Sequence, residues 1–345
     1  MISTRSTIVG TDAVADAARA VPHEIYLGPD GEAVKPVISR SSTWQDLRSL
    51  DLRPRMRVLQ VGTGSGYPAA LMAHIVGPGG HVLTIDPDEA LTSRAGDLFA
   101  AHGHRAIAAT GNGLAGHPGR APYDRIVVAG TPAAIPAAWI DQLAPGGVLV
   151  TGCSVSDLPG AYAVAHIVKT PADDLHVTVH AGRYPFMQSP VVPSHVTVVT
   201  ATDQPGYYLA SASDDHQTTT AFLTLLRAGT AGPWPGPPGE FLDFKHWLLA
   251  RQPRGLFTAV TERGEGVGIG DRAPSNFGLA ARSDGPPEAV MITPTHLVTH
   301  PQESPTWARF LDLMDEWRAE ASRTTHELDA VIWRDGDSYH VRLND

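Results

Sequence analysis

The sequence predicts an α/β fold with a mostly parallel sheet and helices on both faces, followed by a C-terminal α+β extension. Short apolar runs alternate with helical patterns, and each run ends at a glycine or a polar residue, which is typical of a parallel sheet. The composition changes at residues 189–193, SPVVP, where two prolines interrupt the pattern. We therefore expect two domains, residues 1–190 and 191–345.

The strongest local signal is residues 58–67, VLQVGTGSGY. An apolar run at 58–61 precedes glycines at positions 62, 64 and 66, and a helical pattern occupies 68–76. Strand, glycine turn and helix form the first unit of a nucleotide-binding α/β sheet. Tyr67 stands where a dinucleotide fingerprint has its third glycine, which weakens an NAD or FAD interpretation. S-adenosylmethionine (SAM) carries no phosphate and needs only the tight turn, although the pattern alone leaves other nucleotides open.

A second predicted strand, residues 81–85, ends at Asp86. A carboxylate at this place can accept hydrogen bonds from both hydroxyl groups of a ribose. A competing interpretation is that Asp86 caps a helix beginning near Pro87, because Asp and Pro suit the N-cap and N1 positions. The glycine turn that precedes this strand favours the ligand role.

The remaining apolar runs of the first half complete the predicted sheet: residues 106–110, 125–129 and 148–150. Ligands of such sheets bind at the carboxyl ends of the strands. Four residues follow strand ends and are expected to share one edge of the sheet: Gly62, Asp86, Asn112 and Gly130.

Two long stretches, VLQVGTGSGYPAALMAHIVG and GNGLAGHPGRAPYDRIVVAGTPAAIPAAWIDQLAPGGVLV, resemble the protein-L-isoaspartate O-methyltransferase family. The resemblance continues through VHAGRYPFMQ at residues 179–188. It implies a class I SAM-dependent methyltransferase fold, Rossmann-like, that methylates a carboxylate on a peptide or protein. The cofactor-binding residues that it implies are Gly62, Thr63, Gly64, Ser65, Gly66, Tyr67, Asp86, Pro87, Gly111, Asn112, Gly113 and Leu114.

Two departures from the family pattern concern the site. The family usually has an aspartate at the position of Asn112, facing the adenine amino group, and the carbonyl oxygen of an Asn can accept the same hydrogen bond. The family also has an Ile-Ser-x-Pro segment, whose serine lies by the transferring methyl group. Here residues 37–44 read VISRSSTW without a proline, so the candidate catalytic residue is Ser39 or Ser42. A polar, serine-rich loop without a catalytic role is the alternative.

Composition limits the partners and the compartment. The net charge of −10 argues against nucleic acid and anionic membranes as partners. The single Cys153 excludes an internal disulfide, and its place after a buried strand favours a small core side chain over a nucleophile. The sixteen histidines lack metal-site spacing, so we expect no metal. Without an apolar run of ~18 residues to span a bilayer, we expect a cytoplasmic protein, and a monomer.

The second half contains fewer clear signals. A strand is expected at 195–202 and a helix at 218–228, whereas AGPWPGPPG at 231–239 predicts a linker or lid without regular structure. A second helix should begin with Ser304 as N-cap and Pro305 at N1. Its predicted buried face holds Phe310, Leu313, Met314 and Trp317. Asp335-Gly336, flanked by apolar runs, predicts a hairpin.

The extension suggests that one partner is recognised, because the free-standing repair enzymes of the family need no such second half. We expect a specialised relative that methylates an aspartate side chain of a dedicated, ribosomally made modified peptide such as a lasso peptide, graspetide or lanthipeptide. An aspartimide or isoaspartate would follow. A carboxylate with a pKa of ~4 is already ionised at neutral pH and needs no general base. Two alternatives stay open: a broad isoaspartate repair methyltransferase, and a non-catalytic SAM-binding scaffold.

Overall fold

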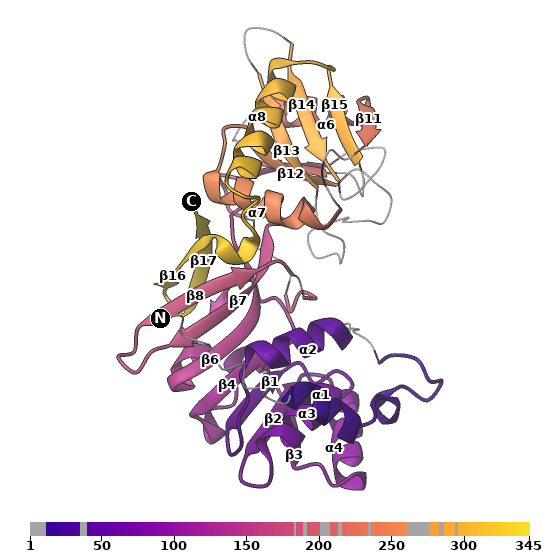
Figure 1. Cartoon of the computed structure of the whole chain (residues 1–345), viewed down its shortest axis with the longest axis vertical. Helices are drawn as coiled ribbons and strands as arrows, with labels where there is room; N and C mark the ends of the chain where they lie inside the picture. The colour runs from indigo at the N-terminus through magenta and orange to yellow at the C-terminus, as the bar shows by residue number, and fades with distance from the viewer. Residues whose placement is uncertain are drawn as a thin grey trace, which may run out of the picture. The chain divides into compact units, whose positions relative to one another are not determined.

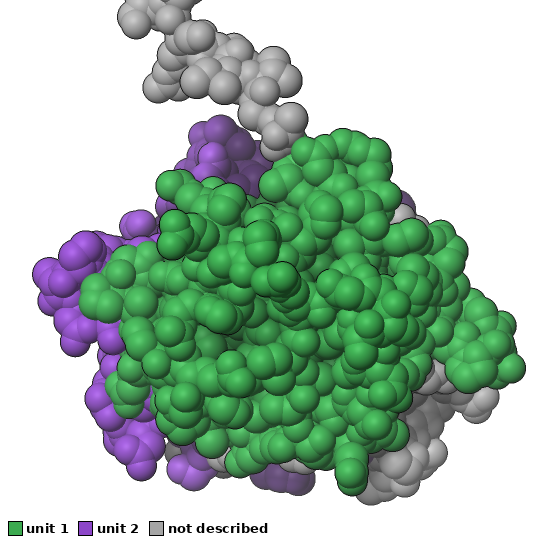
Figure 2. Space-filling model, turned by 90° about the horizontal axis from the view of Figure 1, so that it is seen from below, with its two compact units in different colours: residues 1–129, 138–150 green, residues 130–137, 151–345 purple. Residues whose placement is uncertain are grey.

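The computed structural model describes residues 12–34, 40–182, 184–188, 192–200, 208–212, 216–233, 236, 238–260, 276–282, 286–293 and 296–345, without the side chains of 40–42, 260 and 296. The chain divides into two compact units, coloured separately in Figure 2. Unit 1 comprises residues 1–129 and 138–150, and unit 2 comprises residues 130–137 and 151–345. This division does not coincide with a boundary at residue 190, because it falls inside one long strand, β6 (Leu143–Ser154).

Unit 1 is built on parallel strands that alternate with helices along the chain (Figure 1). Its strands follow the order β3-β2-β1-β4-β6. The bounds are β1 (Arg57–Val61), β2 (His81–Asp86), β3 (Ala106–Thr110) and β4 (Tyr123–Val128). β1 pairs in parallel with β2 on one side and with β4 on the other. Successive strands are therefore added in one direction from β1 to β3, and in the opposite direction from β4 onward. Such a switch point is where parallel sheets bind their ligands.

The predicted strands of the first half are confirmed with bounds that differ by at most two residues, except for the last strand, which is much longer than predicted. The run predicted at 148–150 is the centre of β6, which begins at Leu143 and includes Gly146 and Gly147. Gly146 adopts φ 79°, and the register of β6 against β4 shifts between Tyr123 and Arg125. The two glycines therefore form an irregularity inside the strand instead of ending it.

The α-helices among the described residues of this half are α1 (Ala13–Ala20), α2 (Arg40–Ser49), α3 (Tyr67–Val76), α4 (Glu89–Ala101) and α5 (Ala137–Asp141). The helix predicted at 68–76 is confirmed as α3. The N-cap of α4 is Asp88, whose Oδ1 accepts a hydrogen bond from the backbone N–H of Ala90 at 2.8 Å. The interpretation that Asp86 caps a helix from Pro87 is therefore wrong, and its carboxylate is available for another role.

The larger part of unit 2 follows from residue 151, near the end of β6, and the sheet order continues from β6 to β7 (Tyr162–Lys169) and β8 (Leu175–His180). β7 and β8 pair antiparallel. The predicted hairpin is confirmed as β16 (Asp329–Asp335) and β17 (Ser338–Asn344). β17 also pairs with β5 (Ile135–Pro136), so the end of the described chain and residues 135–136 form one small sheet.

A second seven-stranded sheet lies wholly in unit 2 and is antiparallel throughout, in the order β11-β15-β14-β13-β12-β10-β9. Its strands are β9 (Thr197–Thr200), β10 (Tyr208–Ser211), β11 (Thr230–Pro233), β12 (Leu256–Val260), β13 (Asn276–Ala281), β14 (Glu288–Ile292) and β15 (His296–His300). The expectation of no regular structure at 231–239 is wrong for its first residues, which form β11. Pro233 is tolerated there because β11 is an edge strand, where a missing N–H breaks no ladder.

Helices cover both faces of this second sheet. Phe222, Leu223 and Leu226 of α6 (His216–Arg227) join one apolar cluster with residues of β10, β12 and β14. On the other face Phe277 contacts Phe241 and Phe244 of α7 (Phe241–Arg251), at ring-centroid distances of 5.2 and 6.0 Å. The second predicted helix is confirmed as α8 (Pro305–Ala319) with Ser304 as N-cap, and its four predicted core residues are buried.

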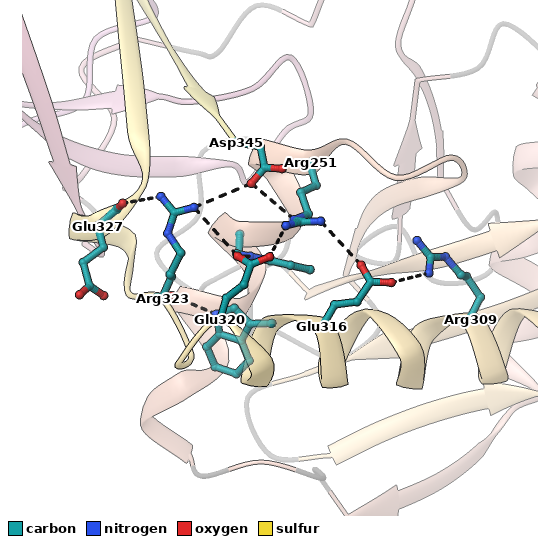
Figure 3. Close-up of polar contacts among 9 residues, drawn as sticks. Arg251, Arg309, Glu316, Glu320, Arg323, Glu327 and Asp345 are labelled. Carbon is teal, nitrogen blue, oxygen red and sulfur yellow. Dashed lines mark hydrogen bonds and ion pairs between the residues drawn. The ribbon is translucent and has the colours of Figure 1, made fainter.

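An ion-pair network joins α7 to α8 and to the last residue (Figure 3). Arg251 contacts Glu320, and its nitrogens lie 3.7 Å from Glu316 Oε2 and 3.5 Å from Asp345 Oδ1. Its guanidinium also lies 4.3 Å from the ring centroid of Trp247, whose Nε1 donates to Glu320 at 3.0 Å. Because these groups are half-buried and share partners, they support one another more than isolated surface pairs do.

Candidate cofactor site

The glycine turn after β1 has the backbone that only glycine adopts without strain. Gly62, Gly64 and Gly66 have φ values of 90°, 51° and 84°. A Cβ added at Gly62 would lie 3.1 Å from the Cβ of Ala129, at the end of β4. One added at Gly66 would lie 3.0 Å from the Cβ of Ala95 in α4. The turn therefore needs glycine both for its conformation and for close packing against its neighbours.

Asp86 joins this turn to the end of β2. The backbone N–H of Thr63 donates to Asp86 Oδ2 at 2.8 Å, and that of Asp88 donates to Oδ1 at 3.0 Å. Asp86 is buried, with 9% of its surface exposed. Each carboxylate oxygen has two lone pairs, so both oxygens retain an acceptor position for a ligand hydroxyl.

A pocket opens between the turn, the end of β2 and the segments before β1. Its lining comprises His23, Tyr26, Leu27, Ala33, Val34, Thr43, Gln60, Gly62, Thr63, Gly64, Ser65, Tyr67, Pro68, Asp86 and Ala129. Six residues predicted from the sequence line it: Gly62, Thr63, Gly64, Ser65, Tyr67 and Asp86. Gly66 and Pro87 are adjacent in sequence but are not among the lining residues.

The segment 111–114 is not among the residues that line this pocket, and its described contacts are within the segment and with other parts of the protein. Oδ1 of Asn112 accepts a hydrogen bond from the backbone N–H of Leu114 at 3.1 Å. The carbonyl oxygen of Gly113 accepts a hydrogen bond from Trp139 Nε1 at 2.8 Å, and a Cβ at Gly113 would lie 2.5 Å from Val61 Cγ1. These contacts account for the sequence of the segment, and its role toward the adenine stays a prediction.

An aromatic wall of His23, Tyr26 and Tyr67 forms one side of the pocket. The ring centroids of His23 and Tyr67 are 4.9 Å apart and those of Tyr26 and Tyr67 are 5.6 Å apart. Burial raises the pKa of Tyr26 to about 12, so its ring stays neutral. Arg94 of α4 donates to the carbonyl oxygens of Leu27 and Ser65, at 2.6 and 3.2 Å, and thereby ties this wall to the glycine turn.

Gln60 provides a second polar group in the pocket wall. Its Nε2 donates to the carbonyl oxygen of Gly62 at 2.6 Å, whereas its buried Oε1 has no hydrogen-bond partner among the described residues. A buried acceptor left without a donor costs about 1–3 kcal/mol, which a ligand donor would recover. The methionine end of SAM carries an ammonium group, the ribose carries two hydroxyls, and the sulfonium is a cation. An orphaned acceptor, a buried carboxylate and an aromatic wall fit those three features.

The two candidate catalytic serines, Ser39 and Ser42, stay predictions. Ser39 lies outside the described residues, and Ser42 belongs to α2 but its side chain is not described. Thr43, the next residue, lines the pocket. The sequence did not single out Thr43, Gln60, His23 or Tyr26, because nothing local to these residues indicates that the fold brings them to the turn.

The structure also bears on the cysteine, on metal binding and on membrane spans. Cys153 is buried in β6, and burial raises the pKa of its thiol to about 12, as expected of a core side chain. Across the described ranges no group of three or more His, Cys, Asp or Glu side chains is arranged to hold a metal ion. No helix among the residues described is long and apolar enough to cross a membrane.

The reversed strand order, the glycine turn and the acidic end of β2 define a class I SAM-dependent methyltransferase fold. The family model for protein-L-isoaspartate(D-aspartate) O-methyltransferase matches residues 4–158. The protein-L-isoaspartate O-methyltransferase of Aeropyrum pernix is 32% identical over 181 residues, which cover 48% of this chain and 68% of that relative. The chain belongs to the protein-L-isoaspartate O-methyltransferase family.

Other relatives with the same description match shorter stretches. That of Ignicoccus hospitalis is 41% identical over 126 residues, covering 36% of this chain and 59% of the relative. That of Hyperthermus butylicus is 45% identical over 109 residues, which cover 29% of this chain and 45% of the relative. The chain thus spans about half the length of these relatives. A solved protein-L-isoaspartate O-methyltransferase aligns with 96% of this chain and 94% of its own, at 18% identity and a TM-score of 0.44.

Proposed function

We propose that this protein is a SAM-dependent carboxyl O-methyltransferase that methylates an aspartate side chain of a dedicated, ribosomally made modified peptide. One observation carries the proposal. The glycine turn, Asp86 and the pocket beside them are intact, and the same chain adds a second sheet with its own core. Family membership supports the methyl transfer, and the additional sheet supports a dedicated partner.

In this proposal the described pocket holds SAM. Asp86 accepts hydrogen bonds from the ribose hydroxyls, and Gln60 Oε1 accepts one from the amino-acid end. The glycine turn allows the backbone to approach the cofactor closely. Pro87 and the segment Gly111, Asn112, Gly113 and Leu114 complete the cofactor site, with Asn112 toward the adenine.

The transfer needs alignment more than acid–base chemistry. SAM supplies a methyl group that is bound to a positively charged sulfur and is ready for displacement. A substrate carboxylate with a pKa of ~4 is ionised at neutral pH, so one of its oxygens forms the new bond without losing a proton. We assign the protein the tasks of holding carboxylate and methyl group in line and of excluding water. Ser39 or Ser42 is proposed to position that carboxylate.

The product of the transfer is an aspartyl methyl ester. The backbone nitrogen of the following residue can attack the ester carbonyl, form a five-membered imide, and release methanol. Water can then open this aspartimide to isoaspartate. Esterification makes this ring closure favourable because methanol is a far better leaving group than an oxide ion.

Two other functions compete with this proposal. A repair methyltransferase that accepts many isoaspartyl peptides is favoured by the family, whose curated relatives carry that description. A non-catalytic scaffold is disfavoured, because a module that has lost methyl transfer is under less constraint to keep the left-handed glycines and the buried carboxylate of a cofactor site. We further propose that residues 191–345 recognise the substrate, and that the enzyme is a cytoplasmic monomer.

Mass spectrometry tests the proposal. The full chain is incubated with SAM and with a candidate substrate, meaning a short Asp-containing peptide in linear and in cyclised form, beside a generic isoaspartyl peptide. The proposal predicts the gain of one CH2 group, then the loss of methanol to a species one water lighter than the starting peptide. If the peptide stays unmethylated while a generic isoaspartyl peptide is methylated, the protein is a repair enzyme.

A further inference from the structure

A groove in unit 2 has a basic rim in a protein whose net charge is −10. Three arginines line it: Arg254, Arg282 and Arg342. Asp157 is the one carboxylate among its described lining residues. The local charge of this lining is therefore opposite to that of the chain as a whole.

The three arginines of the rim differ in whether a carboxylate lies beside them. Oδ2 of Asp157 accepts from Arg342 at 3.0 Å and contacts His195 Nε2 at 3.1 Å, so that this carboxylate already serves two partners. Arg282 donates to the hydroxyl of Thr218 at 2.9 Å, a neutral acceptor, and Arg254 has no ion pair within the described part of the chain. Counting only described residues, Arg254 and Arg282 thus present guanidinium groups that are not paired with a carboxylate.

The position of Arg254 is fixed by the backbone beside it. Gly255 has φ 84°, and a Cβ there would lie 2.0 Å from the carbonyl oxygen of Ala280 in β13. Gly255 therefore continues β12 alongside β13, and its carbonyl oxygen accepts a hydrogen bond from the backbone N–H of Ala280 at 2.9 Å. Arg282 lies just past the end of β13 and Arg254 lies just before β12, so both arginines are at the same end of two neighbouring antiparallel strands.

The floor of the groove is apolar, with Leu158, Phe222, Leu256 and Ala280 all buried. Its volume of about 1000 Å³ is at the upper limit for pockets that hold small molecules. A single inorganic anion would leave most of this space and the apolar floor unused. A peptide segment that alternates carboxylate with apolar side chains would use both, since a guanidinium binds a carboxylate with two parallel hydrogen bonds.

We propose that this groove binds an acidic segment of a peptide, with Arg254 and Arg282 as its carboxylate ligands. The inference deepens the proposed function, because it gives the dedicated peptide an anchoring place apart from the cofactor pocket. Such an anchor would select peptides that carry an acidic segment. The aspartate that is methylated would bind separately, at the cofactor site of unit 1.

Fluorescence anisotropy tests the groove without any methyl transfer. The probe is a labelled peptide in which Asp alternates with Leu, and its counterpart carries Asn in place of Asp. With the full chain, we expect the Asp peptide to bind at least about tenfold more tightly than the Asn peptide. The double variant Arg254→Gln/Arg282→Gln should lose at least that factor, and SAM affinity should not change.

Arg334→Gln is the matched control, because Arg334 is an exposed arginine of unit 2 outside the groove, and it should bind as the unmodified protein does. Equal binding of the two peptides, or an unaffected double variant, would overturn the proposal. Displacement of the peptide by inorganic phosphate at equal concentration would show a simple anion site and overturn it as well. If the protein binds the acidic peptide through these arginines but transfers no methyl group, the groove proposal would stand and the proposed function would be contradicted.

Discussion

The backbone N–H of Thr63 lies 2.8 Å from Oδ2 of Asp86, so the glycine turn after β1 and the carboxylate at the end of β2 form one unit. Thr63 Oγ1 lies 2.9 Å from Thr84 Oγ1, which adds a second link between the same strands. The turn can thus hold its left-handed glycines while the carboxylate keeps one fixed orientation. A preorganised acceptor of this kind loses little entropy when a ligand binds.

Replacing Asp86 tests the cofactor assignment. In Asp86→Ala the charge-assisted hydrogen bonds to the ribose disappear, and SAM affinity should fall at least about tenfold, or 1.4 kcal/mol. Isothermal titration calorimetry measures this loss. Asp88→Ala is the control: it removes the N-cap of α4 and should lower the unfolding temperature with a smaller effect on SAM. Unchanged affinity in Asp86→Ala would contradict the assignment.

Gln60 should affect SAM binding more than stability. Gln60→Met removes a buried acceptor that has no partner in the described structure, but it also removes the Nε2 donor to the carbonyl oxygen of Gly62, so the two effects on thermal stability should largely offset one another. SAM affinity should fall about tenfold, because a ligand donor loses its acceptor. A variant that unfolds more easily and binds SAM normally would show that Gln60 serves only the packing of β1.

The serines before β1 are predicted to act on turnover. At least one of the variants Ser39→Ala and Ser42→Ala should lower kcat much more than it lowers SAM affinity, because the serine contacts the substrate carboxylate. Steady-state kinetics beside calorimetry separates the two quantities. If both variants turn over normally, the positioning group lies elsewhere, and Thr43 is the next residue to change since it lines the pocket.

Cys153 should be inert while the protein is folded. Burial raises the pKa of its thiol from 9.0 to about 12, which lowers the thiolate fraction about a thousandfold at neutral pH. A chromogenic disulfide reagent should therefore label it only in denaturant. Rapid labelling of the native protein would show that this end of β6 opens readily.

The sequence predicted the parallel strands and the turn because their signals are local. The apolar runs, the glycines at 62, 64 and 66, and the Ser304-Pro305 helix start all lie within a few residues of the structure they specify. The sequence also placed Asp86 at the end of the second strand, as the structure has it. It did not distinguish a ligand-binding carboxylate from a helix cap, and the structure shows that the cap of α4 is Asp88, two residues further along the chain.

The rest of the site and of unit 2 depends on contacts between distant residues. His23 and Tyr26 reach the pocket by packing on Tyr67, and their own neighbourhood in sequence gives no sign of this. In the second sheet, β13 reads NFGLAA, where a glycine weakens the strand signal. Gly278 is required there because a Cβ would lie 1.9 Å from the carbonyl oxygen of Val290 on the neighbouring strand.

The proposed function requires that this protein methylates one dedicated peptide in preference to others. The most direct test is a competition for labelled methyl groups from SAM between the cyclised partner peptide and a short generic isoaspartyl peptide. A preorganised ring loses less conformational entropy on binding, at ~0.5–1.5 kcal/mol for each side chain that need not be immobilised, so the partner should be methylated at least tenfold faster. Equal rates on the two peptides, or a faster rate on the isoaspartyl peptide, would contradict the claim and identify a repair methyltransferase.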